Sequence, residues 1–175
     1  MADILFGNAN PSAKLNDTLT YHYEDHPTAE NFGYTSYADK GYDWEANESK
    51  YGSRKFSEND PISAYEEYIY MGYRYFDTFN KEVAYPFGFG LSYSDFTFTD
   101  LDVEANQEEK NFTVSATIKN ESDPDVIPGK EVMEVYVSKP QGDLEQAYQN
   151  LVTFGKTEEL ASGEEQRLEL DISFY

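Results

Sequence analysis

The feature that most restricts the fold of this chain is a series of short segments in which apolar and polar residues alternate. Successive side chains of a β-strand point to opposite faces, so a spacing of two predicts strands with one buried and one solvated face. No helical period separates these segments. They are residues 96–103, 112–118, 133–137 and 168–174.

Turn-forming residues lie where an antiparallel sheet needs its connections, in residues 123–129, 139–143 and 161–164. Strands joined in this way predict a mainly β fold, an antiparallel β-sandwich of the fibronectin type III or immunoglobulin-like kind. Within the first segment the alternation changes phase near Thr99 and Asp100. This change predicts a β-bulge.

The predicted sandwich is incomplete. The sequence supplies about five or six strands, whereas sandwiches of this kind have about seven. A missing strand leaves backbone N–H and C=O groups unpaired along a sheet edge, and such an edge pairs readily with another chain. A homodimer or a strand swap through the open edge is therefore one possible partnership.

Aromatic residues are concentrated in residues 65–93, YEEYIYMGYRYFDTFNKEVAYPFGFGLSY. Their pattern favours short extended segments, including a strand near residues 66–76, over a helix. Gly88 and Gly90 lack the neighbouring lysine of a phosphate-binding loop, so they are predicted to be turn residues. We predict that this stretch is a packed junction, covered by protein that the chain does not itself encode.

The residues before this junction lack a regular period. Ile4, Leu5 and Phe6 precede Gly7, which predicts the last turn of a helix and its exit. One turn is not stable alone, so residues 1–21 are predicted to be the end of a larger domain. An irregular, aromatic-rich linker is predicted for residues 22–84 and the sandwich for residues 85–175.

Charge and composition exclude several kinds of partner and site. The net charge is −21, from 34 acidic and 13 basic residues, which opposes binding to nucleic acid or to an anionic membrane surface. The absence of cysteine excludes disulfides and thiolate metal sites. His22 and His26 flank acidic residues, but Pro27 disfavours the helix that would bring both rings together. Neither a metal nor another cofactor is expected.

Over nearly its whole length the sequence resembles the C-terminal part of family 3 glycoside hydrolases, the β-glucosidase and β-xylosidase family. The most specific segment, YPFGFGLSYSDF at residues 85–96, resembles the entry to the family's fibronectin type III-like domain. LFGNANPSAKLNDT at residues 5–18 resembles the end of its α/β sandwich domain, and EEYIYMGYRYFD at residues 66–77 a following strand. GKEVMEVYVSKP (129–140) and LVTFGKTEELASGEEQRLEL (151–170) also fit.

Three residues depart from the family pattern. The family usually has glycine where Ala13 stands and proline where Asn16 stands, and often glycine at the position of Tyr68. These differences affect the predicted turns.

The resemblance implies no catalytic residue in this chain, because the family's nucleophilic aspartate and acid/base carboxylate lie in segments that this sequence does not contain. Retaining hydrolysis needs two carboxyl groups about 5 Å apart, and Glu66 and Glu67, as neighbours on a strand, would point to opposite faces. An architectural role, with the family's catalytic domains as partners, is implied instead. The predicted domain-junction residues are Glu67, Tyr73, Arg74, Tyr75, Asp77, Tyr85 and Phe87.

Two other functions remain open. A carbohydrate-binding module would use Trp44 and Tyr42 as an aromatic platform, with Arg74 as a sugar contact. For Arg74 we favour a structural role, in which its guanidinium stacks on a flanking ring and pairs with Asp77. The third possibility is an independent protein-interaction domain that uses the open sheet edge.

Overall fold

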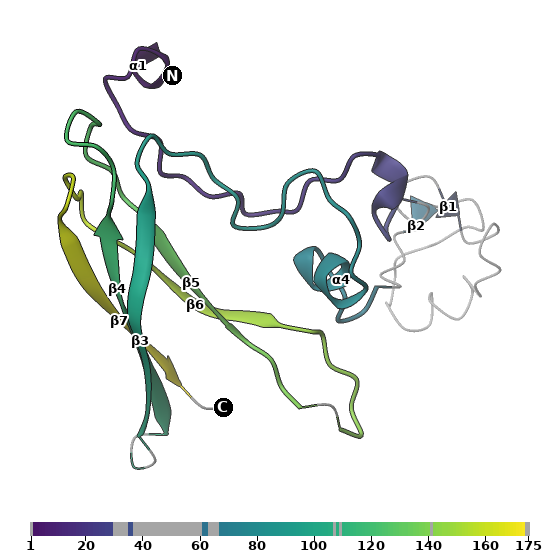
Figure 1. Cartoon of the computed structure of the whole chain (residues 1–175). Coiled ribbons are helices and arrows are strands. Elements are labelled where there is room, and N and C mark those ends of the chain that lie inside the picture. The colour runs from purple at the N-terminus through teal and green to yellow at the C-terminus, as the bar shows by residue number, and fades with distance from the viewer. Residues whose placement is uncertain are drawn as a thin grey trace, which may run out of the picture.

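The computed structural model describes residues 2–29, 35–36, 61–62, 67–106, 108, 110–140 and 142–173. Short elements come first: α1 (Ala2–Leu5), the 3-10 helix η1 (Tyr23–Asp25), β1 (Thr35–Ser36), β2 (Pro61–Ile62) and α4 (Tyr73–Thr78). Five longer strands follow: β3 (Phe96–Asn106), β4 (Asn111–Asn120), β5 (Val132–Val137), β6 (Asn150–Lys156) and β7 (Glu165–Ser173). Figure 1 shows these five strands as one body, from which the N-terminal segments extend toward α4.

The five long strands form two antiparallel sheets, one with the order β3-β4-β7 and the other with β5 paired to β6. This arrangement confirms the predicted fibronectin type III-like β-sandwich and its irregular N-terminal extension. Alternation along the sequence predicted β3, β4, β5 and β7. It did not reveal β6, because Val152 and Phe154 place large apolar side chains on the exposed face of that strand.

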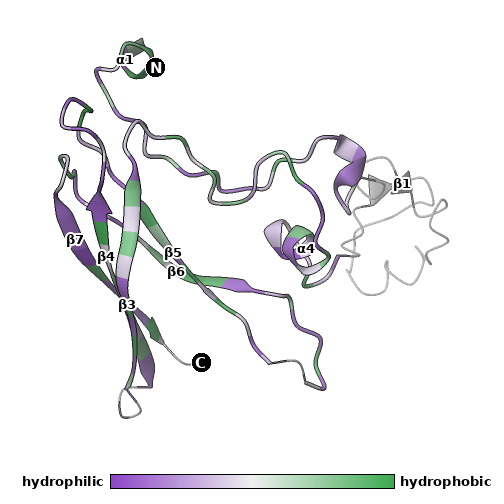
Figure 2. Cartoon of the chain, viewed as in Figure 1, coloured by the Kyte–Doolittle hydropathy of each residue, from purple (hydrophilic) through white to green (hydrophobic). Residues whose placement is uncertain are grey.

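The core lies between β4 and β5. Ala116 and Ile118 of β4 are buried against Met133 of β5, with Phe96 and Leu168 packed around them. Apolar and polar bands alternate along the strands in Figure 2, as a half-buried sheet requires.

Close packing of β6 on β7 explains a glycine near the end of β6. A Cβ atom at Gly155 would lie 2.7 Å from Cδ2 of Leu170. A larger residue would therefore push the two strands apart.

A bulge in β3 confirms the predicted phase change. The register of β3 against β4 shifts between Thr99 and Asp102, and Asp100 has a φ of 51°. This residue with a left-handed conformation bends the strand, so the residues that follow it run in a different direction. All residues of β3 after Phe96 are exposed.

The predicted strand near residues 66–76 is wrong. Residues 67–69 form a turn, and Tyr73–Thr78 form the helix α4. Tyr68 and Gly72 have φ values of 53° and 56°, so the backbone leaves the extended conformation twice within five residues. Aromatic side chains favour strands by propensity, but here their rings pack on several sides of a short helix.

The first residues form α1, in agreement with the predicted helix end. The hydroxyl of Tyr93 donates a hydrogen bond of 2.6 Å to the backbone oxygen of Ile4, which fixes α1 beside the entry to the sandwich. In the part of the chain that the structure describes, no helix has the length and apolar character needed to cross a membrane. Tyr42, Trp44 and Glu66 lie outside the described residues.

Candidate docking junction

Two segments far apart in sequence, residues 10–19 and 84–93, run antiparallel and side by side between the sandwich and α4 (Figure 1). We call this pair the strap. The N–H of Leu15 donates to the oxygen of Phe89 at 2.7 Å, and the N–H of Gly88 donates to the oxygen of Leu15 at 2.9 Å. Leu19 and Tyr85 form a further antiparallel bridge. The strap is therefore held by backbone pairing.

Asn10 fastens the first end of the strap to the sandwich. Its Nδ2 group donates to Oγ of Ser94 at 2.8 Å and to the backbone oxygens of Ile127 and Pro128 at 3.2 and 3.3 Å. Its Oδ1 atom accepts from the hydroxyl of Ser92 at 3.0 Å and from the N–H of Tyr93 at 2.9 Å. One side chain thus links the strap to the β4–β5 connection.

Two lysines fasten the middle of the strap. Lys14 pairs with Glu131 at 2.7 Å, and both side chains are largely buried. Lys156 of β6 donates to the backbone oxygen and to the hydroxyl of Ser12, both at 2.8 Å. The Lys14–Glu131 pair is screened by salt less than an exposed pair, because both of its side chains are largely buried. It therefore holds the strap against the β5–β6 sheet.

The far end of the strap is fastened through Tyr73 of α4. Its ring lies 4.9 Å from that of Phe87 and 5.8 Å from that of Tyr136, measured between ring centroids. Its hydroxyl accepts a hydrogen bond of 2.8 Å from the N–H of Leu151 in β6. The strap, the helix and both strands of the small sheet therefore meet at one ring.

Polar bonds complete the docking of α4 on the start of β6. The carboxylate of Asp77 accepts from Nε2 of Gln149 at 3.0 Å, and the hydroxyl oxygen of Thr78 accepts from the N–H of Tyr148 at 2.9 Å. The helix is consequently bonded at two successive residues of the β5–β6 connection.

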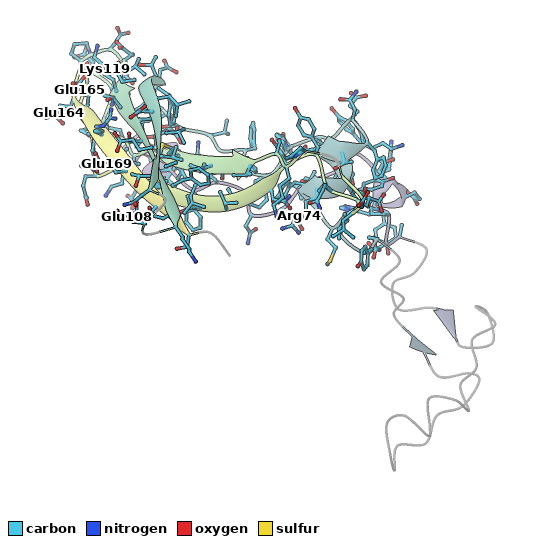
Figure 3. All side chains as sticks on the ribbon, turned by 90° about the horizontal axis from the view of Figure 1, so that it is seen from below. Arg74, Glu108, Lys119, Glu164, Glu165 and Glu169 are labelled. Carbon is cyan, nitrogen blue, oxygen red and sulfur yellow. The ribbon has the colours of Figure 1, made fainter. Side chains whose placement is uncertain are left out.

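Arg74 stacks on a ring as predicted, with its guanidinium carbon 5.5 Å from the centroid of Tyr73. Its predicted pairing with Asp77 is not seen. Among the described residues no ion pair joins the two side chains, because Asp77 bonds to Gln149 instead. Figure 3 places Arg74 well apart from the labelled charged residues of the sandwich.

Tyr136 of β5 is partly buried on the sandwich side of the junction. Its hydroxyl donates to Glu134 at 2.7 Å. Burial raises the pKa of Tyr136 well above its ordinary value, and the bond to Glu134 raises this pKa further. Gly88 of the strap passes so close to the Glu134 carboxylate that a Cβ atom there would overlap it.

Glu67 is buried, with 8% of its surface exposed, and neither of its carboxylate oxygens has a hydrogen-bond partner among the described residues. Within the same part of the chain, Thr18 Oγ1 and Arg74 Nε are also buried without a partner. Folded proteins rarely leave buried polar atoms without a hydrogen-bond partner. All three belong to the strap or to the segment around α4.

Large apolar side chains are exposed on the strap and on the segments at its two ends, which we together call the strap side of the molecule. They come from the N-terminal segment, from the turn before α4 and from the strap itself. They are Leu5, Phe6, Tyr23, Tyr68, Met71 and Leu91.

The remaining predicted residues pack within the junction. Tyr75 lies 5.2 Å from the rings of both Phe76 and Phe79, and Tyr85 lies 4.8 Å from Phe89. His26 packs edge-on against Phe76 at 5.7 Å. No group of three or more metal-ligating side chains is found among the described residues.

Sequence reasoning missed the residues that fasten the strap to the sandwich. They are Asn10, Lys14, Glu131, Tyr136, Gln149 and Lys156. Each contacts a segment distant in sequence, and no periodic pattern marks such pairs.

Comparison with known proteins places these features in a larger context. Residues 131–175 match the family described as fibronectin type III-like domain. The chain is 34% identical over 173 residues to a β-glucosidase of Ruminococcus albus, covering 98% of this chain and 15% of that protein.

Solved structures agree with this match. β-Glucosidase 3B of Thermotoga neapolitana in complex with glucose superposes with a TM-score of 0.76 at 37% identity, over 98% of this chain and 20% of that one. The GH3 β-glucosidase of Bifidobacterium adolescentis gives a TM-score of 0.77 at 29% identity, over 98% and 21% of the two chains. The chain thus spans about a fifth or less of the length of these relatives.

Proposed function

Since this chain belongs to the family 3 glycoside hydrolases and corresponds to a C-terminal segment of them with a fibronectin type III-like domain, we propose that it is a non-catalytic structural module. In this proposal it docks on the catalytic part of a family 3 hydrolase through the strap and α4. It fixes the relative placement of the catalytic domains. The parent activity in this proposal is that of a β-glucosidase or β-xylosidase.

The observation that carries this proposal is the exposure of large apolar side chains on the strap side. Phe6 and Tyr68 are 81% and 79% exposed. Aromatic residues are enriched at the centres of protein–protein interfaces. Tyr68 also has a left-handed φ of 53°, which costs free energy in a residue with a large side chain.

The fastening of the strap supports a positioning role. Asn10, Lys14 and Tyr73 attach it at its start, middle and end. A partner bound to the strap would therefore be held at a fixed place relative to the sandwich. Such placement matters for catalysis, because a displacement of about 1 Å at a reacting group costs about a hundredfold in rate.

The geometry of the described carboxylates supports a non-catalytic role. Glu67, one of the acidic residues within the aromatic-rich stretch 65–93, is buried. Glycoside hydrolysis needs two carboxyl groups on either side of a bound sugar. The acidic groups of the junction, Asp77 and Glu134, instead bond to Gln149 and Tyr136.

A chimaeric enzyme tests the proposal. The segment of Thermotoga neapolitana β-glucosidase 3B that matches this chain is replaced by the chain, and hydrolysis of an aryl β-glucoside is measured. We expect turnover by the chimaera and none by the pure 175-residue chain. In the chimaera, Asn10→Asp should lower kcat, whereas Asn8→Asp, the same change at an exposed side chain, should not.

Two results would overturn the proposal. One is turnover of the aryl glucoside by the pure chain, with a rate that follows the protein concentration. The other is a chimaera whose kcat is the same with and without Asn10→Asp, although hydrogen exchange shows that the strap has been released.

A further inference from the structure

Glu67 differs from the other acidic residues of the junction, because its carboxylate is buried and has no hydrogen-bond partner. Asp77 and Glu134 accept hydrogen bonds from Gln149 and Tyr136, at 3.0 and 2.7 Å. Glu67 is 8% exposed, and no described residue bonds to either of its carboxylate oxygens. A buried carboxylate without a partner is strongly unfavourable, because it loses its contact with water and gains no bond in exchange. The turn before α4 therefore contains a group whose partner the described part of the chain does not supply.

The basic side chains of the described residues do not neutralise Glu67. None of the ion pairs that these residues form includes Glu67. Arg74, the described basic residue nearest to it in sequence, has its guanidinium carbon 5.5 Å from the centroid of the Tyr73 ring. The Nε atom of Arg74 is itself buried without a hydrogen-bond partner. A counter-charge for Glu67 therefore has to come from outside the described residues.

The turn that carries Glu67 is arranged opposite to what water favours. Residues 67–69 form this turn, and the N–H of Tyr70 closes it by donating to the backbone oxygen of Glu67 at 2.8 Å. The turn buries a carboxylate, whereas the aromatic side chain of Tyr68 is 79% exposed. Tyr68 also has a left-handed φ of 53°, which is strained for a large side chain. In the chain alone, this turn therefore keeps three unfavourable features within two residues.

We infer that the surface which covers this turn in the assembled hydrolase carries a basic side chain that pairs with Glu67. This inference rests on the proposed function, which places the catalytic part of a family 3 hydrolase on the strap side. Tyr68 and Met71 are among the exposed side chains of that side, so a surface that covers them comes within reach of Glu67. Arginine matches the site best, because its planar fork can donate to both carboxylate oxygens at once.

Pairing requires the turn to rearrange, because both carboxylate oxygens of Glu67 are closed to solvent in the chain alone. The strain at Tyr68 lowers the free energy that this rearrangement needs. Glu67 is thus a docking residue, whose carboxylate is satisfied only when the chain and the catalytic part are assembled.

The inference gives one substitution opposite effects in two settings. In the pure chain, Glu67→Met replaces an unpaired buried carboxylate by apolar atoms of similar volume, so the closed turn becomes more stable. In the chimaeric hydrolase, the same change removes one half of a buried pair and leaves the basic side chain unpaired, so the docked turn becomes less stable. A residue that acts only within the chain would change stability in the same direction in both settings.

Amide hydrogen exchange at Tyr70 measures both effects, because its N–H closes the turn. Glu67→Met should slow this exchange about tenfold in the pure 175-residue chain and accelerate it at least about tenfold in the chimaera. Glu67→Gln, which keeps the shape but not the charge, should also accelerate it in the chimaera. Glu159→Met, the same change at an exposed acidic residue, should leave the exchange of Tyr70 unchanged in both proteins.

Three results would overturn this inference. Glu67→Met could change the exchange of Tyr70 in the same direction in both proteins, which would mean that Glu67 acts only within the chain. In the chimaera, Glu67→Gln could leave the exchange unchanged, or Glu159→Met could accelerate it as much as Glu67→Met does. None of these results needs turnover to be lost, so the proposed function would stand. A folded chimaera without turnover would count against the proposed function instead, and exchange at Tyr70 would still decide the role of Glu67.

Discussion

Asn10 provides the sharpest test of how the strap is fastened, because its side chain makes three hydrogen bonds to the sandwich side of the junction and two to the second segment of the strap. Replacing Asn10 by aspartate keeps its shape but turns the amide donor into a carboxylate oxygen. The bonds from Nδ2 to Ser94, Ile127 and Pro128 are then lost. The new oxygen also faces two backbone oxygens, which repel it.

The expected cost follows from the bond lengths. A hydrogen bond contributes about 0.5 to 1.5 kcal/mol net, and the shortest bond lost, to Ser94, measures 2.8 Å while the other two exceed 3.1 Å. Counting one full and two weaker bonds gives about 2 to 3 kcal/mol. This raises the opening equilibrium of the strap by about 30- to 150-fold.

Amide hydrogen exchange measures this opening residue by residue. Exchange at Leu15 and Gly88, whose amides pair within the strap, should accelerate by about this factor in Asn10→Asp. Exchange at Ile118 in the core of the sandwich should change little, because opening is local. Asn8→Asp is the matched control. The reasoning fails if strap exchange is unchanged, or if strap and core accelerate equally.

Three further predictions concern stability. Gly88→Ala should lower the unfolding free energy measured in urea more than Gly163→Ala, because both glycines have a left-handed φ but only Gly88 faces the Glu134 carboxylate. Gly163, which has open space around it, should lose about 1 kcal/mol. Equal losses at the two positions would contradict the packing argument. Asn120→Ala should lower the unfolding free energy by about 2 to 3 kcal/mol, seen as a lower Tm in circular dichroism, because this residue is 1% exposed and bonds to two backbone groups at 2.9 and 3.0 Å; an unchanged Tm would refute it. The pKa of Tyr136 is raised in the folded state, so its contribution to stability is complete below the unfolded value of about 10 and is lost as pH rises beyond that value. Unfolding free energies measured from about pH 9 to 11 should therefore decline less steeply in Tyr136→Phe than in the unchanged chain. Parallel declines would exclude this linkage.

Local patterns in the sequence predicted the sandwich well. β4, with Val114, Ala116 and Ile118 buried at alternate positions, follows from a spacing of two. The bulge in β3 also follows, because a phase change is visible in the letters themselves. The strand β6 was not predicted, because its apolar residues lie on both faces.

The junction was predicted less completely. Aromatic content indicated packing around Tyr73, but not that residues 73–78 are helical, because strand propensity points the other way. The contacts of Asn10 span 82 to 118 residues of sequence. Such pairs depend on the tertiary fold, and no local rule identifies them.

The central claim is that the strap side of this chain is an interface, and solvent labelling measures it directly. Hydroxyl-radical labelling of Tyr68, Met71 and Leu91, all exposed in the chain alone, is compared between the pure chain and the chimaeric hydrolase. We expect these three side chains to be labelled several-fold less in the chimaera. Equal labelling of all three in a folded, active chimaera would contradict the claim.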